Sequence, residues 1–484
     1  GQYIEDLTID KSLTLRSSGG AANTTIEGTV AIDIEDDEHV VLGGTGSGFE
    51  ITGSGNGIEA TVQYWSSLSI AGNTVTDNAY GIYVNYVRYF SELDISGNTI
   101  TANGSQGIYI EGASAVQYHS SASIIDNVIT DNGDDGIYWN DIFNNSHGLI
   151  QGNTITGNGD DGIWFDGVEH GSSLDILDNT VSNNAGRGIY IYEYEEGCRG
   201  LIRGNTISNN GSHGIYMSDD VDYGSEVIFE DNAITGNGGY GLRVDDVEYG
   251  GYLAILNNDI RDNDGPGIYV YEFDDGGSGL IAGNTVTGHT GFGIYVRSGV
   301  DEGSSLSIEG NTVSGTVTAP VSDKYLGEFW GWPEFYLGFS PVVPGSETVK
   351  LNDVPTLNYT LYAREGYIVL NPTPPNGTQV TADYSYGGTG IFIGDRVDEG
   401  SSLFIDANTV TNNGHGGIYV RSIEEGSRVV IGSAGNTITG NGSFGVAVGD
   451  SYYEWYWDEW YYYGVEAVSY THLRAHETVL DLVC

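Results

Sequence analysis

The sequence predicts an all-β solenoid in which one short, strand-containing unit is stacked many times. The first observation behind this prediction is a phrase that recurs twelve times: an Asn, a β-branched aliphatic residue two positions later, and then a run similar to Gly-Ile-Tyr-Val. The second is its period, because successive Asn residues lie 25 to 29 positions apart except for one gap of 97. The twelve residues are Asn73, Asn98, Asn127, Asn153, Asn179, Asn205, Asn232, Asn258, Asn284, Asn311, Asn408 and Asn436.

Each unit alternates between apolar and polar side chains, as strands with one buried face do. In residues 67–85, for example, Leu68, Ile70, Val75 and Ile82 alternate with polar or aromatic residues. The position two after each Asn is Val or Ile in all twelve units, so these side chains are expected to stack as an internal aliphatic column. The Asn is expected at a bend, where its amide can bond the backbone and the Asn of the next coil. The Gly before each Ile is expected to supply a second bend.

The repeat pattern resembles the right-handed parallel β-helix family, which includes pectin-lyase-like enzymes and surface proteins with the same repeats. The resemblance covers roughly residues 1–320 and 387–467. It implies a right-handed parallel β-helix solenoid of about fourteen rungs. It says little about activity, because this fold carries many different functions.

Between the two parts of the predicted solenoid, residues 321–386 are expected to form a small inserted β module. This segment accounts for the gap of 97 and, with Pro320, holds eight of the nine prolines. The strands predicted at residues 367–370 and 379–384 flank a Pro-Thr-Pro-Pro-Asn-Gly sequence, which indicates a hairpin. The hairpin resembles small β-sandwich modules of phage-tail and bacterial surface proteins.

Both ends of the sequence suggest a fragment of a longer protein. The chain opens inside a repeat, and residues 468–484 resemble the translation of a transposon-type sequencing adapter. We expect this tail to be non-native and to carry no chemistry. Outside it, Cys198 is the one cysteine, so neither a disulfide framework nor a cysteine metal site is expected.

The charge balance is strongly acidic and limits the possible partners. There are 67 acidic and 16 basic residues, which gives a net charge of -51. Such a field repels nucleic acid and anionic membranes and attracts cations. It also resembles that of proteins adapted to high salt, where screening removes self-repulsion. No apolar run is long enough to span a membrane.

An outward-facing aromatic column is the first candidate ligand-binding surface. In each Gly-Ile-Tyr-Val run the residue after Ile faces outward, because side chains alternate along a strand. Consecutive rings should therefore rise by about 4.8 Å, close to the repeat of a sugar chain. The alternative is that the rings only stabilise the sheet, by about 0.2–1 kcal/mol per neighbouring pair. The candidate glycan-binding residues are Tyr138, Trp164, Tyr190, Tyr216, Tyr269 and Tyr295.

A second aromatic group lies near the end of the chain. Residues 452–463 hold three Trp and six Tyr, and exposed aromatic side chains at this density are typical of a binding surface. Glycan stacking and packing against a missing continuation are both open. The candidates are Trp455, Trp457 and Trp460.

The same outward face could instead carry an enzyme site. A polysaccharide lyase or uronate epimerase needs a Lys, Arg or Tyr base and a cation that neutralises the substrate carboxylate. The best cluster for these roles is Arg243, Asp245, Tyr271 and Arg297. Glycoside hydrolysis would need a carboxylate pair. No catalytic site stands out clearly.

Another turn of the repeat carries carboxylates in rung after rung. Stacked carboxylates repel one another, and Ca²⁺ prefers such oxygen ligands. Diffuse counterions are the simpler interpretation. The densest candidate for a metal site is the group Asp134, Asp135, Asp160 and Asp161, although Arg187 in the next rung could neutralise it instead. The other acidic turns hold Glu169, Glu195, Glu196, Asp222, Glu248, Asp274, Asp275, Asp301, Glu302, Asp398, Glu399, Glu424 and Glu425.

The function indicated by these patterns is that of an extracellular or cell-surface β-helix protein that binds polysaccharide or another surface. A polysaccharide lyase, uronate epimerase or glycoside hydrolase on the same fold is the first alternative. A structural spacer within a large surface protein is the second.

The acidic turns predict that stability depends on salt. At molar NaCl the screening length falls to about 3 Å, so repulsion between carboxylates in successive rungs should largely disappear. We expect the melting temperature at neutral pH to rise steeply from low to molar NaCl, as followed by circular dichroism. A melting temperature that stays constant over this range would show that the acidic turns are compensated within the protein.

Overall fold

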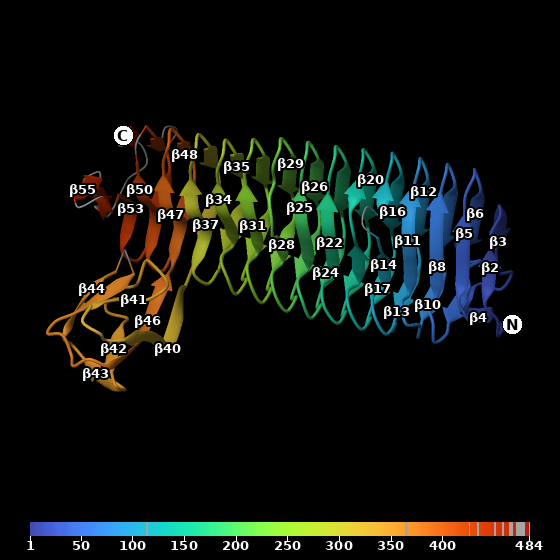
Figure 1. Cartoon of the computed structure of the whole chain (residues 1–484), viewed down its shortest axis with the longest axis horizontal. Coiled ribbons are helices and arrows are strands. Elements are labelled where there is room, and N and C mark those ends of the chain that lie inside the picture. The colour runs from blue at the N-terminus through green and yellow to red at the C-terminus, as the bar shows by residue number, and fades with distance from the viewer. Residues whose placement is uncertain are drawn as a thin grey trace.

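The fold was analysed in a computed structural model, and it is a long rod with a small module beside one end (Figure 1). The structure describes residues 1–112, 115–363, 366–424, 426–432 and 435–449. Beyond Gly449 it describes only the backbone of four strands: β54 (Tyr452–Tyr456), β55 (Glu459–Tyr463), β56 (Val468–Tyr470) and β57 (Leu480–Val483).

The rod is built from three parallel sheets, which we name A, B and C, and each coil of the chain adds one strand to each sheet. Sheet A contains the strands that directly follow the repeated Asn residues. It has fifteen strands, one more than the predicted number of rungs, and the predicted fold is confirmed. In order they are β1 (Gln2–Tyr3), β4 (Thr25–Glu27), β7 (Glu50–Thr52), β10 (Thr74–Thr76), β13 (Thr99–Thr101), β17 (Val128–Thr130), β21 (Thr154–Thr156), β24 (Thr180–Ser182), β27 (Thr206–Ser208), β30 (Ala233–Thr235), β33 (Asp259–Arg261), β36 (Thr285–Thr287), β39 (Thr312–Ser314), β49 (Thr409–Thr411) and β52 (Thr437–Thr439).

Sheet B contains the Gly-Ile-Tyr-Val runs, and two of its rungs are split into two short strands. In order they are β2 (Leu7–Ile9), β5 (Val30–Ile34), β8 (Ile58–Gln63), β11 (Ile82–Arg88), β14 (Ile108–Ile110) with β15 (Val116–Gln117), β18 (Ile137–Trp139) with β19 (Ile142–Phe143), β22 (Ile163–Val168), β25 (Ile189–Tyr194), β28 (Ile215–Met217), β31 (Leu242–Val247), β34 (Ile268–Phe273), β37 (Phe292–Val300), β47 (Thr389–Val397), β50 (Gly416–Ile423) and β53 (Phe444–Val448).

Sheet C precedes the repeated Asn in each coil and closes the triangular cross-section. Its strands are β3 (Leu13–Leu15), β6 (His39–Gly43), β9 (Ser67–Ala71), β12 (Glu92–Ser96), β16 (Ser121–Ile125), β20 (His147–Gln151), β23 (Ser173–Leu177), β26 (Arg199–Arg203), β29 (Glu226–Glu230), β32 (Tyr252–Leu256), β35 (Ser278–Ala282), β38 (Ser305–Glu309), β48 (Ser402–Asp406) and β51 (Arg428–Ile431). One short 3₁₀ turn, η1 (Ala21–Asn23), lies in the first coils. Among the described residues, no helix is long and apolar enough to cross a membrane.

The interior of the rod is one continuous aliphatic core. In sheet A, Val75 pairs with Ile100, and Ile100 pairs with Ile129. All three side chains are fully buried. The predicted internal aliphatic column is therefore confirmed.

The repeated Asn residues form a buried ladder along the corner between sheets C and A. Asn205 shows the pattern: its Nδ2 donates to the carbonyl oxygen of Ile176 at 2.8 Å and to Oδ1 of Asn232 at 3.0 Å. Its backbone N–H donates to the same Oδ1 of Asn232 at 3.0 Å. The structure confirms the predicted bonds of the amide to the backbone and to the Asn of the next coil.

A second Asn ladder, which the sequence analysis did not recognise, runs along the corner between sheets A and B. Its members stand five positions after the members of the first ladder. Asn210 donates from Nδ2 to the carbonyl oxygen of Val181 at 3.2 Å and to Oδ1 of Asn237 at 3.0 Å. The ladder consists of Asn78, Asn103, Asn132, Asn158, Asn184, Asn210, Asn237, Asn263, Asn413 and Asn441, and His289 and Thr316 replace Asn in two rungs.

In most rungs the Gly before Ile lies at a bend, as predicted, and close packing gives a further reason for its lack of a side chain. At Gly188, a Cβ atom would lie 2.4 Å from Cγ2 of Ile207 and 2.5 Å from the carbonyl oxygen of Gly214. The residue is therefore Gly because the core and the next rung approach its backbone closely.

The inserted module leaves the rod after β39 and returns at β47. It consists of two small antiparallel sheets that share a core containing Ile368 and Val380. One sheet has the order β40 (Thr318–Glu328), β46 (Gln379–Gly387), β42 (Thr348–Leu351) and β43 (Val354–Thr356). The other has the order β41 (Glu334–Tyr336), β45 (Tyr367–Leu370) and β44 (Tyr359–Tyr362).

The predicted hairpin between residues 367–370 and 379–384 is wrong, although both strands exist. β45 pairs with β41 and β44, whereas β46 pairs with β40 and β42. The proline-rich segment between them is not a tight turn but crosses from one sheet to the other. Ile368 and Val380 then face a common core instead of lying in one ladder.

The last strands reverse the direction of sheets B and C. β56 pairs antiparallel with β53, and β57 pairs antiparallel with β51. Both strands fall in residues 468–484, for which a non-native origin stays a prediction.

The first Asn ladder predicts a specific loss of stability in one rung. Asn205→Ala would leave several buried donors and acceptors without partners, and we expect the free energy of unfolding to fall by about 2–4 kcal/mol. The control is Thr206→Ala, whose side chain is exposed on the neighbouring position. It should cost about 1 kcal/mol or less. Urea denaturation followed by circular dichroism measures both changes, and equal losses would contradict the role of the ladder.

Candidate functional site

The outward aromatic column on sheet B is present, and its rings contact one another. The rings of Tyr138 and Trp164 are stacked, with centroids 4.1 Å apart and planes 7° apart. Trp164 and Tyr190 are tilted by 30° at 5.3 Å, and Tyr190 and Tyr216 meet edge to face at 5.7 Å. These four side chains are partly exposed.

Farther along the rod the column becomes covered. Tyr269 is only 3% exposed, and Tyr295 is partly exposed. Tyr295 stacks on Phe392, which stacks on Tyr419, and both of these rings are buried. Of the six predicted ligand-binding residues of the column, Tyr269 is therefore the one whose ring is least available to a ligand.

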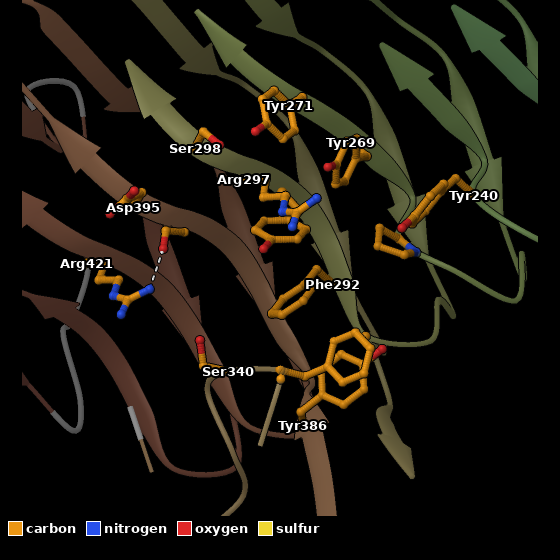
Figure 2. Close-up of a pocket in the computed structure, with 16 residues that line it drawn as sticks. Tyr240, Tyr269, Tyr271, Phe292, Arg297, Ser298, Ser340, Tyr386, Asp395 and Arg421 are labelled. Atoms are coloured by element: carbon orange, nitrogen blue, oxygen red, sulfur yellow. Dashed lines mark hydrogen bonds between the residues drawn. The ribbon is translucent and has the colours of Figure 1, made fainter. Parts of the chain in front are cut away.

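A pocket lies where the inserted module meets the covered part of sheet B (Figure 2). Its volume is about 450 Å³. Strands β34, β37, β47 and β50 of sheet B supply one wall, and the module supplies the other. We call it the sheet B pocket, and its main lining residues are Tyr240, Tyr269, Tyr271, Phe292, Tyr295, Arg297, Ser340, Tyr386, Asp395 and Arg421.

Two guanidinium groups and several rings face this pocket. The guanidinium carbon of Arg297 lies 5.4 Å from the centroid of Tyr271. Nη1 of Arg421 donates to the carbonyl oxygen of Gly394 at 3.2 Å, which is the dashed line in Figure 2. From the module, Tyr386 stacks on Phe339 at 4.4 Å. The pocket thus combines apolar ring surface with hydrogen-bond donors.

Burial disfavours ionisation of two phenols in the pocket. Burial raises the pKa of Tyr269 to about 12, although a hydrogen bond from Arg297 opposes this shift. Burial also raises the pKa of Tyr295. Both hydroxyl groups are therefore protonated at neutral pH, so they can donate hydrogen bonds but are poor general bases.

Two of the four predicted catalytic residues line the sheet B pocket, and the other two lie beside it. Tyr271 and Arg297 line the sheet B pocket, but Arg243 and Asp245 do not. Nε of Arg243 lies 2.7 Å from Oδ1 of Asp245, because side chains two positions apart on a strand share a face. Asp245 also accepts a hydrogen bond from the hydroxyl of Tyr216 at 3.1 Å. Arg243 nevertheless lies close to the pocket, because its guanidinium carbon is 5.2 Å from the centroid of Tyr269, and a catalytic role for these four residues stays a prediction.

The sequence analysis missed the part of the pocket that the module provides. Ser340 and Tyr386 belong to strands and loops whose position against sheet B has no signal in the repeat pattern. Arg421, in contrast, continues the outward column of sheet B that holds Tyr271 and Arg297, so the register of the repeats indicates it. Asp395 lies in a bulge of β47, which the repeat pattern does not indicate.

The four predicted metal ligands lie together at one edge of the rod. Oxygen atoms of Asp134, Asp135 and Asp160 lie within 4.8 Å of one another. Asp161 instead pairs with Arg187, whose Nη2 lies 2.8 Å from Oδ2. Burial, followed by repulsion from Asp161, raises the pKa of Asp135 to about 7. Arg187 thus neutralises part of the group, and cation binding by the remainder stays a prediction.

The predicted aromatic surface near the end of the chain cannot be placed in the same way. Trp455 and Trp460 fall in β54 and β55, whose side chains lie outside the described part of the chain. Trp457 also lies outside the described residues.

A half-buried histidine lies beside the aromatic column. The backbone N–H of Tyr240 donates to Nδ1 of His213 at 3.0 Å, and the two rings stack at 4.8 Å. Burial lowers the pKa of His213 to about 4, and the charges of Arg243 and Arg187 add to this effect. The imidazole is therefore neutral at pH 7.

Comparisons with known proteins identify a family and a fold. Residues 4–141, 56–222 and 196–313 match the family described as right handed beta helix region. The comparison with curated proteins finds no significant match.

Among solved structures, the periplasmic alginate epimerase AlgG is 15% identical, with 60% of this chain and 72% of that chain covered and a TM-score of 0.37. The A-module of the Azotobacter vinelandii mannuronan C-5 epimerase AlgE6 is 17% identical, with 61% and 92% covered and a TM-score of 0.37. The Dettilon tailspike protein is 15% identical, with 79% and 87% covered and a TM-score of 0.29. At this identity the likeness concerns the fold alone.

His213 predicts how stability depends on pH below neutrality. Its pKa is about 4 in the folded protein and 6.5 as the ordinary value, so the unfolded chain binds more protons between these pH values. Stability from this residue is present above pH 6.5 and is lost as the pH falls toward 4, by on the order of 3 kcal/mol at most. Between pH 6.5 and 4, the melting temperature of His213→Gln should therefore fall less than that of the wild type. His39→Gln, at an exposed position, serves as the control. Identical pH profiles for the wild type and His213→Gln would contradict this assignment.

Proposed function

The chain belongs to the right-handed β-helix family, and on this basis we propose that it binds a polysaccharide along the outer face of sheet B. The observation that carries the proposal is the sheet B pocket, where aromatic rings, phenols and guanidinium groups meet at the end of an outward aromatic column. We also propose an extracellular or cell-surface location, because polysaccharides are abundant at cell surfaces.

The aromatic column supports binding of an extended sugar chain. Tyr138, Trp164, Tyr190 and Tyr216 are partly exposed and belong to consecutive rungs, so they offer a contact about every 4.8 Å. The tilted and edge-to-face contacts among the last three rings leave ring surface that is not used in mutual stacking. Such surface can pack against the apolar faces of sugar rings.

The pocket supports recognition of one sugar unit in that chain. Its volume of about 450 Å³ lies in the range of sites for small ligands, about 300–1,000 Å³. The protonated phenol of Tyr295 and the guanidinium of Arg297 supply donors for sugar oxygens. Because the net charge of -51 repels polyuronates unless cations bridge them, the proposed ligand is a neutral glycan with few acidic groups.

A polysaccharide lyase or epimerase is the second candidate. Its support is the position of Arg297 beside Tyr271 in the pocket, because a cation and a phenol are groups that uronate chemistry uses. The raised pKa values of Tyr269 and Tyr295 argue against these two phenols as bases. Binding without chemistry is the preferred function, because the net charge of -51 also repels the polyuronates on which such enzymes act.

The proposal predicts that glycan binding depends on the column. Retardation of the protein in gels that contain neutral polysaccharides should be lost when Trp164, Tyr190 and Tyr216 are changed together to Ala. We expect an affinity at least tenfold weaker, which corresponds to about 1.4 kcal/mol. The matched control is Trp65→Ala, an exposed aromatic residue in the turn after β8.

Unchanged retardation in the triple variant, with the same circular dichroism spectrum as the wild type, would assign the column a purely structural role. Incubation with polyuronates tests the second candidate, because a lyase releases unsaturated products that absorb ultraviolet light. Loss of this absorbance in Arg297→Gln would place the chemistry in the sheet B pocket.

A further inference from the structure

A group of four carboxylates lies where two successive coils pass from sheet B toward sheet C. Val221 and Val247 form a parallel bridge, and both side chains are fully buried. The residues on either side of each Val therefore lie level with their counterparts in the next rung, about 4.8 Å away. We call these residues the central carboxylate cluster: Asp220, Asp222, Asp246 and Glu248.

The spacing of the oxygen atoms matches one coordination sphere. One carboxylate oxygen from each of Asp220, Asp222 and Glu248 lies within 4.8 Å of the others. Ca²⁺ binds oxygen at about 2.3–2.6 Å, so ligands on opposite sides of the ion are about 4.8 Å apart. A single ion can therefore contact all three side chains.

Two oxygen atoms of the cluster are buried without a partner. Asp222 is only 3% exposed, and its Oδ1 has no hydrogen-bond partner. Oδ1 of Asp246 is also buried and without a partner. Burial, followed by repulsion from Glu195 and Asp220, raises the pKa of Asp222 to about 7. Unpaired buried carboxylates of this kind are unfavourable unless a cation or a proton compensates them.

The two comparable carboxylate groups among the described residues each have an arginine in an ion pair at or beside the group. In the group at Asp134, Asp135 and Asp160, the adjacent Asp161 pairs with Arg187. Among the described residues, no Lys, Arg or His forms an ion pair with any member of the central carboxylate cluster.

The second group, formed by Asp301, Asp398 and Glu399, forms ion pairs with Arg396. Nε of Arg396 lies 3.0 Å from Oδ2 of Asp301 and 3.6 Å from Oδ2 of Asp398. Arg396 precedes Val397, which pairs with Val300, as Asp246 precedes Val247. At the position where this rung has a guanidinium, the central cluster has another carboxylate.

We propose that Asp220, Asp222 and Glu248 bind a Ca²⁺ ion, with Asp246 as a neighbouring carboxylate that adds to its attraction. All donors are oxygen atoms, which favours a hard cation over zinc or copper. Ca²⁺ accepts an irregular arrangement of oxygen ligands, whereas Mg²⁺ requires a nearly ideal octahedron. Carboxylates held on the fixed backbone of two rungs therefore suit Ca²⁺ better. The ion would join two successive coils at mid-rod.

The test measures Ca²⁺ binding and melting temperature on the full chain after removal of divalent cations. In the wild type, Ca²⁺ should raise the melting temperature above a NaCl control of equal ionic strength, and calorimetry should detect the site. Asp222→Asn should weaken Ca²⁺ binding at least tenfold. Without Ca²⁺ the same variant should melt at or above the wild-type temperature, because a buried unpaired charge is gone. The matched control is Asp398→Asn, which should keep the wild-type Ca²⁺ affinity.

Terbium luminescence gives an independent readout. Tyr223 and Tyr249, whose rings stack at 5.2 Å, directly follow Asp222 and Glu248 and can sensitise a bound Tb³⁺ ion. Equal Ca²⁺ responses in the wild type and Asp222→Asn would overturn the proposal in favour of diffuse counterions. A Ca²⁺ effect no larger than that of NaCl, or a loss in Asp398→Asn instead, would also overturn it. These experiments contain no glycan, so their outcome is independent of the proposed function.

Discussion

The constraint on which the whole structure depends is the parallel register between successive coils. Each rung hydrogen-bonds to the next with equivalent residues level, as in the pairing of Val75 with Ile100. Any residue type that recurs in the sequence is therefore stacked on copies of itself about 4.8 Å apart. Asn residues can use this geometry fully, because one amide both donates to and accepts from its neighbours, and the two Asn ladders hold two corners of the rod.

The same register is unfavourable for charged residues. Carboxylates one rung apart repel each other, and burial strengthens the repulsion because it removes water. The chain relieves it in two places with a guanidinium from a neighbouring rung, Arg187 or Arg396. The aromatic column lies between these extremes: its rings gain from contact with each other, but each contact uses surface that a ligand would otherwise meet. A ligand can therefore bind best where tilted rings or the inserted module interrupt regular stacking.

The sequence alone was sufficient for everything that depends on the repeat. The period of the repeat predicted the length of one coil. The alternation of apolar and polar residues predicted the buried face of each strand, as at Val75 and Ile100. The second Asn ladder was equally readable from its constant offset of five residues. The pocket could not be predicted from the sequence, because it depends on how Tyr386 and Ser340 of the module pack against sheet B. This packing is a tertiary contact without periodicity. The hairpin error has the same origin, since the pairing of β45 and β46 was decided by their shared core.

The rod continues across the inserted module as if the module were absent: Thr312 of β39 pairs with Thr409 of β49 over a gap of 97 residues. This interruption adds little to the loss of chain entropy on folding. The entropic free energy of closing a loop grows with the logarithm of the loop length. Adding a rung across 97 residues instead of 26 therefore costs only about 1 kcal/mol more. Because the module enters and leaves through the paired strands β40 and β46, other domains with adjacent ends could occupy the same place. The rod therefore provides a fixed site at which one wall of the pocket can be exchanged during evolution while the other is kept.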